Sequence, residues 1–309
     1  MIKDFFLEEI RKKGGFRVNH AHFDKAYLIT PNLLKKSQAS LQDKWNLYRE
    51  LKENYTEKDL FHRMSKCIRK MISQDVKYVK TFVDADSIVG LKCINAALDI
   101  KKTFSPIIEI DIAIQPLEGL DDPESRDVFV QACGLADVIG GLPDRDKDPR
   151  KHIEFIFQLA QIMDKPVDIH VGQNNLPCEK ETEMVLDVLE EMKIKQKVNL
   201  VHCISLNCQT KEYIHKQATR MKNLNVSVIV CPSAALSMKQ QHQVMAPIHN
   251  SIAPVLELLE CGVDVKLGID NIADLFMPLV DGDLYFESRL LMEAIRCYNI
   301  DLISNIVSK

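Results

Sequence analysis

The hydrophobic positions of this chain fall into short runs rich in Val and Ile, separated by longer segments in which apolar residues recur at helical spacing. Eight such runs lie at residues 16–22, 78–86, 106–116, 136–143, 166–172, 198–204, 225–234 and 264–270. Strands that alternate with helices predict a parallel sheet with helices packed outside it. Several runs are almost continuously apolar, which is typical of strands buried on both faces. The pattern predicts an α/β protein with a (β/α)8 TIM barrel.

An open, doubly wound sheet is the alternative architecture. No glycine-rich dinucleotide fingerprint follows the first run, which favours the barrel. The sequence shows no internal repeat, low-complexity tract or linker, so we expect a single barrel domain over residues 1–309. Within it, residues 1–14 are expected to form an N-terminal helix. Residues 30–76 are expected to form a helical insertion after the first strand, with two helices that cover the mouth of the barrel.

Composition and charge narrow the class of partner. The formal net charge is -4, which argues against a nucleic-acid-binding protein. The nine cysteines are far apart and contain no Cys-x-x-Cys pair, as expected for reduced thiols in the cytoplasm. The N-terminal segment does not resemble a signal peptide, and no apolar run approaches the ~20 residues of a membrane span. We therefore expect a cytoplasmic protein that acts on a small-molecule substrate and binds neither nucleic acid nor a membrane.

The candidate chemistry lies near the carboxyl ends of the predicted strands, where TIM barrels carry their active sites. Four histidines and an aspartate share this position: His20, His22, His170, His202 and Asp270. His20 and His22 are two residues apart in a strand and therefore point the same way. Neutral imidazoles and a carboxylate are suitable ligands for zinc or iron. Their coincidence at the ends of different strands predicts a metal site.

A single histidine near a strand end is more often packed or hydrogen-bonded than bound to a metal. We apply that interpretation to the other histidines, which fall in helical or loop segments: His62, His152, His215, His242 and His249.

Several segments resemble the amidohydrolase superfamily, and within it the cytosine deaminase-like branch that includes N-isopropylammelide hydrolase. These segments are VNHAHFDKA at 18–26, PLEGL at 116–120, ADVIGGLPDRD at 136–146, VDIHV at 167–171, LVHCISL at 200–206 and GVDVKLGIDNIADLFMPLVDGD at 262–283. The resemblance extends from about residue 15 to about residue 300. It implies a metal-dependent hydrolase of the TIM-barrel type that acts on C–N bonds.

The resemblance also implies roles for the residues at the strand ends. One divalent ion, zinc or iron, would be held by the following four residues: His20, His22, His170 and Asp270. Such an ion lowers the pKa of a water that it binds from about 15.7 toward about 7. Asp270 would move the proton, and His202 would stabilise the negative oxygen that develops. No clear lysine candidate for carboxylation ends the fourth strand, which favours a single, unbridged ion.

Lys25 follows the histidine pair and has two interpretations of equal weight. In ammelide hydrolase-like members a lysine at this place serves the substrate, so the resemblance implies that Lys25 reaches a polar edge of the substrate. The alternative is a surface lysine that forms a salt bridge with Asp24. Asp24 itself is expected to support the site by accepting a hydrogen bond from a ligand imidazole or from Lys25.

The sequence departs from the branch at three positions. Gln173 stands where deaminases have a glutamate that shuttles a proton, and an amide cannot do so at neutral pH. Leu117 stands where a glutamine reads the pyrimidine edge, and Ile269 where a histidine often precedes the aspartate. These differences argue against cytosine as the substrate. Gln173, Leu117, Asn271 and Asp144 are candidates for shaping the substrate pocket, although a loop or capping role is equally open for Asn271 and Asp144.

The branch usually adds a small β-sandwich built from both chain ends, and here we expect little or none of it. A homodimer is one way to cover the apolar surface thus left at the base. The leading hypothesis is a mononuclear metal-dependent amidohydrolase that releases an amine or ammonia from a small nitrogen heterocycle or cyclic amide. Two alternatives stay open: a cytosine or pyrimidine deaminase, and a catalytically degenerate barrel that keeps its metal and acts as a binding protein.

Overall fold

The computed structural model describes residues 2–238, 245 and 252–309, and in these ranges eight parallel strands form one sheet. Each strand pairs with the next strand along the chain. The strands are β1 (Phe16–Ala21), β2 (Val76–Asp84), β3 (Glu109–Gln115), β4 (Val138–Gly141), β5 (Val167–Val171), β6 (Val198–His202), β7 (Ser227–Val230) and β8 (Val265–Leu267). Every strand overlaps one of the eight apolar runs of the sequence.

The sheet closes because the backbone just beyond β8 pairs with β1. The amides of Ile269 and Asp270 donate to the carbonyl oxygen of His20, at 2.9 and 3.2 Å. The amide of His22 donates in turn to the carbonyl oxygen of Asp270, at 3.0 Å. The resulting cylinder confirms the predicted (β/α)8 barrel. The same bonds bring the backbones of His20, His22 and Asp270 together across the seam.

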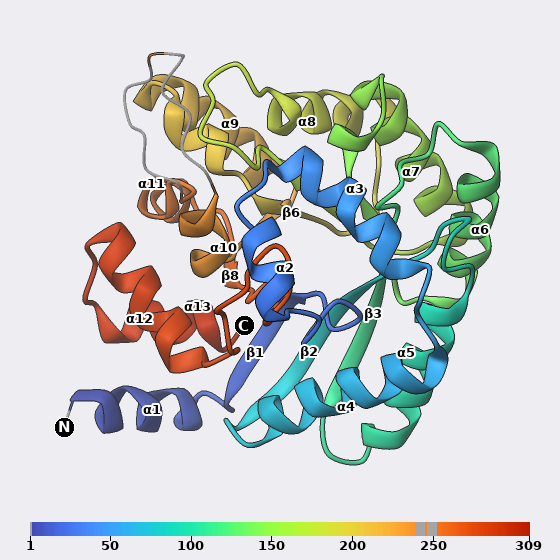
Figure 1. The fold of residues 1–309 in the computed structure, drawn as a ribbon. Helices are drawn as coiled ribbons and strands as arrows, with labels where there is room; N and C mark the ends of the chain where they lie inside the picture. Colours follow the sequence, from blue (N-terminus) through green and yellow to red (C-terminus); the bar gives the residue numbers. More distant parts are fainter. Residues whose placement is uncertain (1, 239–244, 246–251) are drawn as a thin grey trace.

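Helices form a ring outside the strands (Figure 1). The ring consists of α4 (Glu57–Ile72), α5 (Lys92–Phe104), α6 (Pro123–Leu135), α7 (Pro149–Met163), α8 (Glu181–Met192), α9 (Lys211–Asn223), α11 (Val255–Glu260) and α12 (Leu284–Ile295). Five of them begin after a side chain whose oxygen accepts a backbone amide of the first turn, namely Thr56, Asp122, Asp148, Thr210 and Asp283. Such caps satisfy amides that the helix itself leaves unpaired. Within the described ranges, no helix has the length and apolarity needed to cross a bilayer.

Two further helices lie on the side of the barrel where β1 and β8 meet (Figure 1). Helix α13 (Ile300–Val307) packs on β8 and β1, and α1 (Ile2–Lys12) packs on α13 with Phe6 and Ile10 buried. The ammonium of Lys13 contacts the Asp301 carboxylate at 2.6 Å. In the described residues all named strands belong to the barrel sheet, so this part of the chain contains no accessory β-sandwich.

The segment at 30–76 holds three helices, where the sequence pattern predicted two. They are α2 (Pro31–Lys36), α3 (Leu41–Lys52) and α4. The breaks between the helices are set by local caps, because Ser40 and Thr56 each accept an amide of the helix that follows. Helix α4 joins the ring beside β2 and α5. Helices α2 and α3 lie across the open end of the barrel (Figure 1).

Helix α3 is fixed to the barrel by buried polar contacts. The Tyr48 hydroxyl donates to Asp274 Oδ2 at 2.5 Å and accepts the amide of Leu275 at 3.2 Å. The Tyr48 ring stacks on Phe276 with 4.7 Å between the ring centroids. At the end of the helix, Lys52 Nζ lies 2.6 Å from a carboxylate oxygen of Asp86. Helix α3 is therefore held in a fixed position at the mouth of the barrel.

Replacement of Tyr48 by Phe is expected to lower the free energy of unfolding by about 2 kcal/mol. The variant keeps the ring but removes a hydrogen bond to a buried carboxylate, and bonds to charged groups are each worth about 1.5–3 kcal/mol. Urea unfolding followed by circular dichroism measures the change. Tyr298→Phe is the matched control, because its hydroxyl bonds Glu293 at a site where Tyr298 is 64% exposed. Equal stability of the two variants would mean that the bond to Asp274 does not hold α3.

Candidate active site

The predicted metal ligands meet at the open end of the barrel. His20 lies in β1, His22 follows that strand, and Asp270 follows β8. The Nε2 atoms of His20 and His22 are 3.1 Å apart. Asp270 Oδ1 lies 3.4 Å from the Nε2 of His22 and 3.7 Å from that of His20. The imidazoles thus point toward one another and toward the carboxylate, as the sequence predicts.

Strands β5 and β6 supply two further imidazoles from the opposite wall. His170 lies 4.8 Å from His20 between ring centroids, and its Nδ1 lies 3.2 Å from the carbonyl oxygen of Gly141. The contact to Gly141 requires a proton on Nδ1, so Nε2 remains an acceptor. His202 Nε2 lies 3.8 Å from Asp270 Oδ2. Two groups of three residues have all their ligand atoms within 4.8 Å of one another: His20, His22 and His170, and His20, His202 and Asp270.

The backbone is strained at two of these residues. His202 has φ 77° and Asp270 has φ 59°, both in the left-handed region that non-glycine residues seldom adopt. Each costs on the order of 1–3 kcal/mol, which the surrounding structure must offset. Both residues lie where a strand ends and the chain turns, so the strained conformation directs their side chains into the mouth of the barrel.

Burial sets the charge of the cluster. It lowers the pKa of His20, His170 and His202 to about 3, and the pKa of His22 well below its ordinary value. The imidazoles are therefore neutral at pH 7, which is the form that binds metals. Burial also raises the pKa of Asp270. Burial therefore disfavours both the protonated imidazoles and the ionised carboxylate of Asp270. A cation that binds the neutral imidazoles and the carboxylate together would stabilise this arrangement.

The cluster fits a divalent metal ion. Among the described residues, His170 Nε2 is a buried atom without a hydrogen-bond partner, although buried polar atoms in proteins are almost always paired. Zinc ligands lie ~2.0–2.1 Å from the ion, so two ligands of one tetrahedral ion are about 3.3 Å apart. The observed separations of 3.1 and 3.4 Å agree with that spacing. The two groups share His20, and together they contain the four residues predicted to hold a single ion, namely His20, His22, His170 and Asp270, with His202 beside them.

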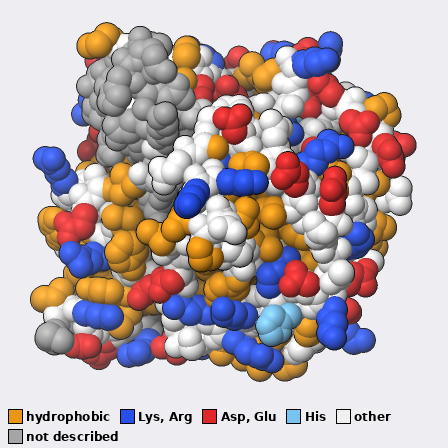
Figure 2. Space-filling model, viewed as in Figure 1, with side chains coloured by type: hydrophobic (Ala, Val, Ile, Leu, Met, Phe, Trp, Pro, Cys, Tyr) orange, Lys and Arg blue, Asp and Glu red, His pale blue; other side chains and the backbone are white. Residues whose placement is uncertain are grey.

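A pocket of ≈ 820 Å³ opens from this cluster. Four of the five predicted substrate-binding residues line it: Lys25, Leu117, Gln173 and Asn271. The fifth, Asp144, lies one step behind the wall and accepts a hydrogen bond from Gln173 Nε2 at 3.2 Å. Seen from this side, the molecule carries charged side chains of both signs around the rim, with hydrophobic side chains between them (Figure 2).

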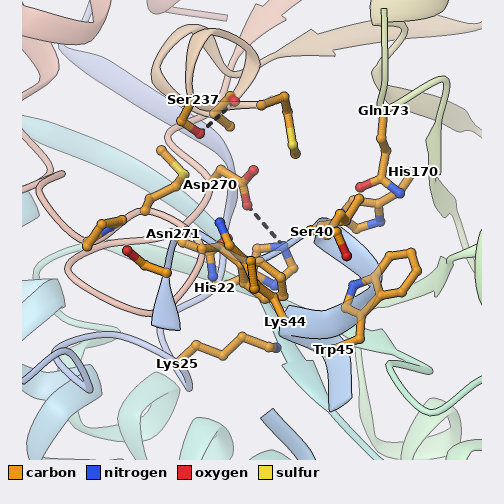
Figure 3. A pocket seen from close by; sticks show the side chains of 18 of the residues that line it. His22, Lys25, Ser40, Lys44, Trp45, His170, Gln173, Ser237, Asp270 and Asn271 are labelled. Carbon is orange, nitrogen blue, oxygen red and sulfur yellow. Dashed lines mark hydrogen bonds and ion pairs between the residues drawn. The ribbon is translucent and has the colours of Figure 1, made fainter. Parts of the chain in front are cut away.

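Lys25 is a buried residue of the pocket floor and not a surface lysine. Its ammonium lies 2.7 Å from Asp84 Oδ1 and 3.4 Å from both carboxylate oxygens of Asp24. Burial lowers the pKa of Lys25, but the two carboxylates outweigh this and raise it above its ordinary value. Gln115 also lies 3.4 Å away, through its amide oxygen. The predicted contact with Asp24 is present, although Lys25 is not at the surface, and Lys25 also faces the pocket (Figure 3). Its contact with a substrate stays a prediction.

Part of the pocket could not be anticipated from motifs. Its outer wall contains Ser40, Lys44 and Trp45 at the start of α3, and Phe276 from the loop after β8. The sequence predicts helices over the barrel mouth at 30–76, but it identifies no residue of that segment as part of the pocket. One further signal was available, since Trp45 is the chain's single tryptophan and lies in that segment.

His152 is one of the histidines that the sequence analysis assigned to packing or hydrogen bonding. His152 is buried, with Nδ1 2.6 Å from Asp146 Oδ2 and Nε2 accepting the amide of Leu142 at 3.0 Å. This is the hydrogen-bonded arrangement that the sequence interpretation assigned to it. His242 and His249 lie outside the described residues.

Two curated proteins are similar to this chain in sequence. No protein-family model matches it. An uncharacterized protein of Haemophilus influenzae is 34% identical over 263 residues, which cover 84% of this chain and 95% of that protein. The N-isopropylammelide isopropyl amidohydrolase of a Pseudomonas species is 22% identical over 299 residues, or 92% of this chain and 70% of the relative.

Solved structures share the fold. The 5-methylcytosine deaminase from Klebsiella pneumoniae, liganded with 5-fluorocytosine, has a TM-score of 0.86 at 22% identity, over 94% of this chain and 72% of that chain. The N-isopropylammelide isopropylaminohydrolase from Burkholderia multivorans has a TM-score of 0.75 at 20% identity, over 95% and 73% of the two chains. Together with the Pseudomonas relative, these matches confirm the resemblance seen in the sequence. The chain belongs to one family with the Haemophilus influenzae protein, and its sequence and fold are similar to those of the cytosine deaminase and N-isopropylammelide hydrolase branch of the amidohydrolase superfamily.

Proposed function

We propose that the protein is a mononuclear metal-dependent amidohydrolase. It hydrolyses a C–N bond of a small nitrogen heterocycle or cyclic amide and releases an amine or ammonia. The observation that carries this proposal is the convergence of the histidines and Asp270, from distant parts of the chain, at the floor of one pocket. The pocket volume of ≈ 820 Å³ is in the range of small-molecule sites. A cytoplasmic location and a homodimer remain predictions.

The metal ligands in this proposal are the neutral imidazoles of His20, His22 and His170 and the carboxylate of Asp270. Nitrogen and oxygen donors of this kind suit zinc or iron. A divalent cation held there would supply a nucleophile at neutral pH, because such an ion lowers the pKa of water toward about 7.

Asp270 and His202 perform the proton and charge steps. Asp270 accepts the proton of the attacking water and returns it to the leaving nitrogen, as its position between the histidines allows. His202 is neutral at pH 7, so its Nε2 can donate a hydrogen bond to the oxygen that becomes negative. Its position, 3.8 Å from Asp270 Oδ2, places donor and base on the same side of the pocket.

The walls of the pocket suit a flat, polar ring. Trp45 and Phe276 supply aromatic faces, and Gln115 and Asn271 supply amide groups. Aromatic faces stack on planar rings, and amides can both donate to and accept from ring atoms. The names of the relatives support the same class, since the Pseudomonas protein is an N-isopropylammelide amidohydrolase and the Klebsiella protein a 5-methylcytosine deaminase.

Two alternatives are each favoured by one observation. The TM-score of 0.86 with 5-methylcytosine deaminase favours a pyrimidine deaminase. Gln173 weighs against it, because its amide is bonded to Asp144 and cannot shuttle a proton to a ring nitrogen. The same residue favours a degenerate barrel that binds a ligand without turnover.

The products formed by metal-replete protein distinguish these functions: released ammonia or amine from an exocyclic C–N bond, and the ring-opened acid from a cyclic amide, which chromatography detects. The panel contains cyclic amides, hydantoins, substituted triazines and pyrimidines. We expect the best cyclic amide or triazine to be hydrolysed at least ~100-fold faster than cytosine, since a missing general acid–base group costs 10²–10⁴-fold. Fastest release from cytosine would identify a deaminase. Absence of both released amine and ring-opened product, with ligands that still raise the melting temperature, would identify a binding protein.

A further inference from the structure

Three charged side chains line the described part of the pocket: Lys25, Lys44 and Asp270. Asp270 lies among the imidazoles, and Lys25 is paired with Asp84 at 2.7 Å. The charges of these two residues are therefore balanced by groups of the protein or by the metal that the site fits. Lys44 differs from both.

Lys44 lies in the first turn of α3 and is half-buried, with its side chain directed into the pocket (Figure 3). Asp274 attracts it, but both carboxylate oxygens of Asp274 have other partners. Oδ2 accepts from Tyr48 and Asn271, and Oδ1 accepts the amides of Phe276 and Met277. Within the described ranges no anion or hydrogen-bond acceptor contacts the ammonium of Lys44.

Keeping the half-buried Lys44 ammonium charged costs free energy unless an anion contacts it. Burial lowers the pKa of Lys44, and the attraction of Asp274 does not restore it. For Lys25 the balance is the reverse, because two carboxylates raise its pKa. A half-buried cation whose nearby carboxylate is bonded to other groups is expected to be compensated by a ligand. Tyr48 and Lys52 anchor the same helix, so the position of Lys44 relative to the histidine cluster is fixed.

We propose that Lys44 binds an anionic group of the substrate, so that the protein acts on nitrogen heterocycles or cyclic amides that carry a carboxylate or a similarly acidic group. This inference rests on the proposed function and narrows its substrate class. The reacting bond lies at Asp270 and His202, and the anionic group lies at Lys44 on the wall formed by α3. Charge complementarity of this kind selects acidic substrates over their neutral analogues.

Matched pairs of ring compounds test the inference: uracil and uracil-6-carboxylate, hydantoin and hydantoin-5-acetate, and cytosine and cytosine-5-carboxylate. Isothermal titration of the metal-replete full-length protein gives the dissociation constants, and steady-state assays give KM and kcat for any compound that is hydrolysed. We expect the acidic member of at least one pair to bind tenfold or more tightly than its neutral partner. Lys44→Met should weaken that binding by about tenfold to hundredfold, with KM rising more than kcat falls.

Two variants serve as controls. Lys44→Arg should retain the preference for the acidic member, because it keeps the positive charge. Lys36→Met removes an exposed lysine of the neighbouring α2 and should leave affinities unchanged. The inference is overturned if no acidic member binds more tightly than its neutral partner, or if Lys44→Met keeps the preference. Failure of the proposed function has a different signature, namely that no compound is hydrolysed, by amine release or by ring opening, while one metal ion per chain is bound.

Discussion

Replacement of Asp270 by Asn is expected to lower kcat by at least ~10³-fold, since general acid–base groups contribute 10²–10⁴-fold and this residue is also a proposed metal ligand. Asparagine has nearly the same shape, but its amide cannot accept the proton of the attacking water. The substitution also changes the donor that lies 3.4 Å from His22 Nε2. Initial rates of amine release under saturating substrate measure the effect.

The folded state is expected to tolerate Asp270→Asn. Burial raises the pKa of Asp270, which means that the metal-free protein disfavours its charge, and the neutral amide avoids that cost. Asp281→Asn is the matched control, because this exposed carboxylate lies in the same loop and outside the pocket. The control should retain full activity. If Asp270→Asn keeps more than about a tenth of kcat, Asp270 does not carry the proton, because the loss of a general acid–base group alone costs at least about 10²-fold.

Removal of the metal is expected to abolish activity and to lower stability. Dialysis against a chelator removes the cation from its four proposed ligands, which are buried. Their neutral imidazoles have few other partners among the described residues. A ligand present at 1,000 times its dissociation constant stabilises the folded state by ~4.1 kcal/mol, so loss of a tight metal should lower the melting temperature clearly. One equivalent of zinc or iron should restore both activity and melting temperature.

The matched variant for this experiment is His22→Ala. Its melting temperature should respond little to the chelator, because the site has lost a ligand whose Nε2 lies 3.1 Å from that of His20. His62→Ala, on α4 and outside the cluster, should behave as the wild type. Full activity of wild-type protein shown to be free of metal would refute a metal-dependent mechanism.

The barrel could be predicted because its signals are local. Strands buried on both faces produce apolar runs, and helical segments lie between them, so all eight strands were located. Boundaries were less accurate where the chain leaves the sheet. The seventh run, 225–234, contains both β7 and the start of α10 (Pro232–Ser237), because Pro232 begins a helix within an apolar stretch. The eighth run reaches Asp270, which lies beyond β8 in left-handed backbone.

The convergence of the metal ligands could be predicted for the same reason, since parallel strands bring their ends to one face. The substrate side of the pocket could not. Gln173 bonds Asp144, which follows a different strand. Lys25 is buried against Asp84, which lies 59 residues farther along the chain. Lys44 reaches the pocket through α3, whose place depends on Tyr48 and Asp274, 226 residues apart. Side-chain pairs so distant leave no periodic signal in the sequence.

Elemental analysis of protein purified without added metal tests the central claim most directly. Wild-type protein should contain one zinc or iron ion per chain, and His20→Ala, which removes a buried ligand at the centre of both three-residue groups, should contain almost none. A wild-type protein without a transition metal, or the same metal content in both proteins, would contradict the assignment of these imidazoles and Asp270 as a metal centre.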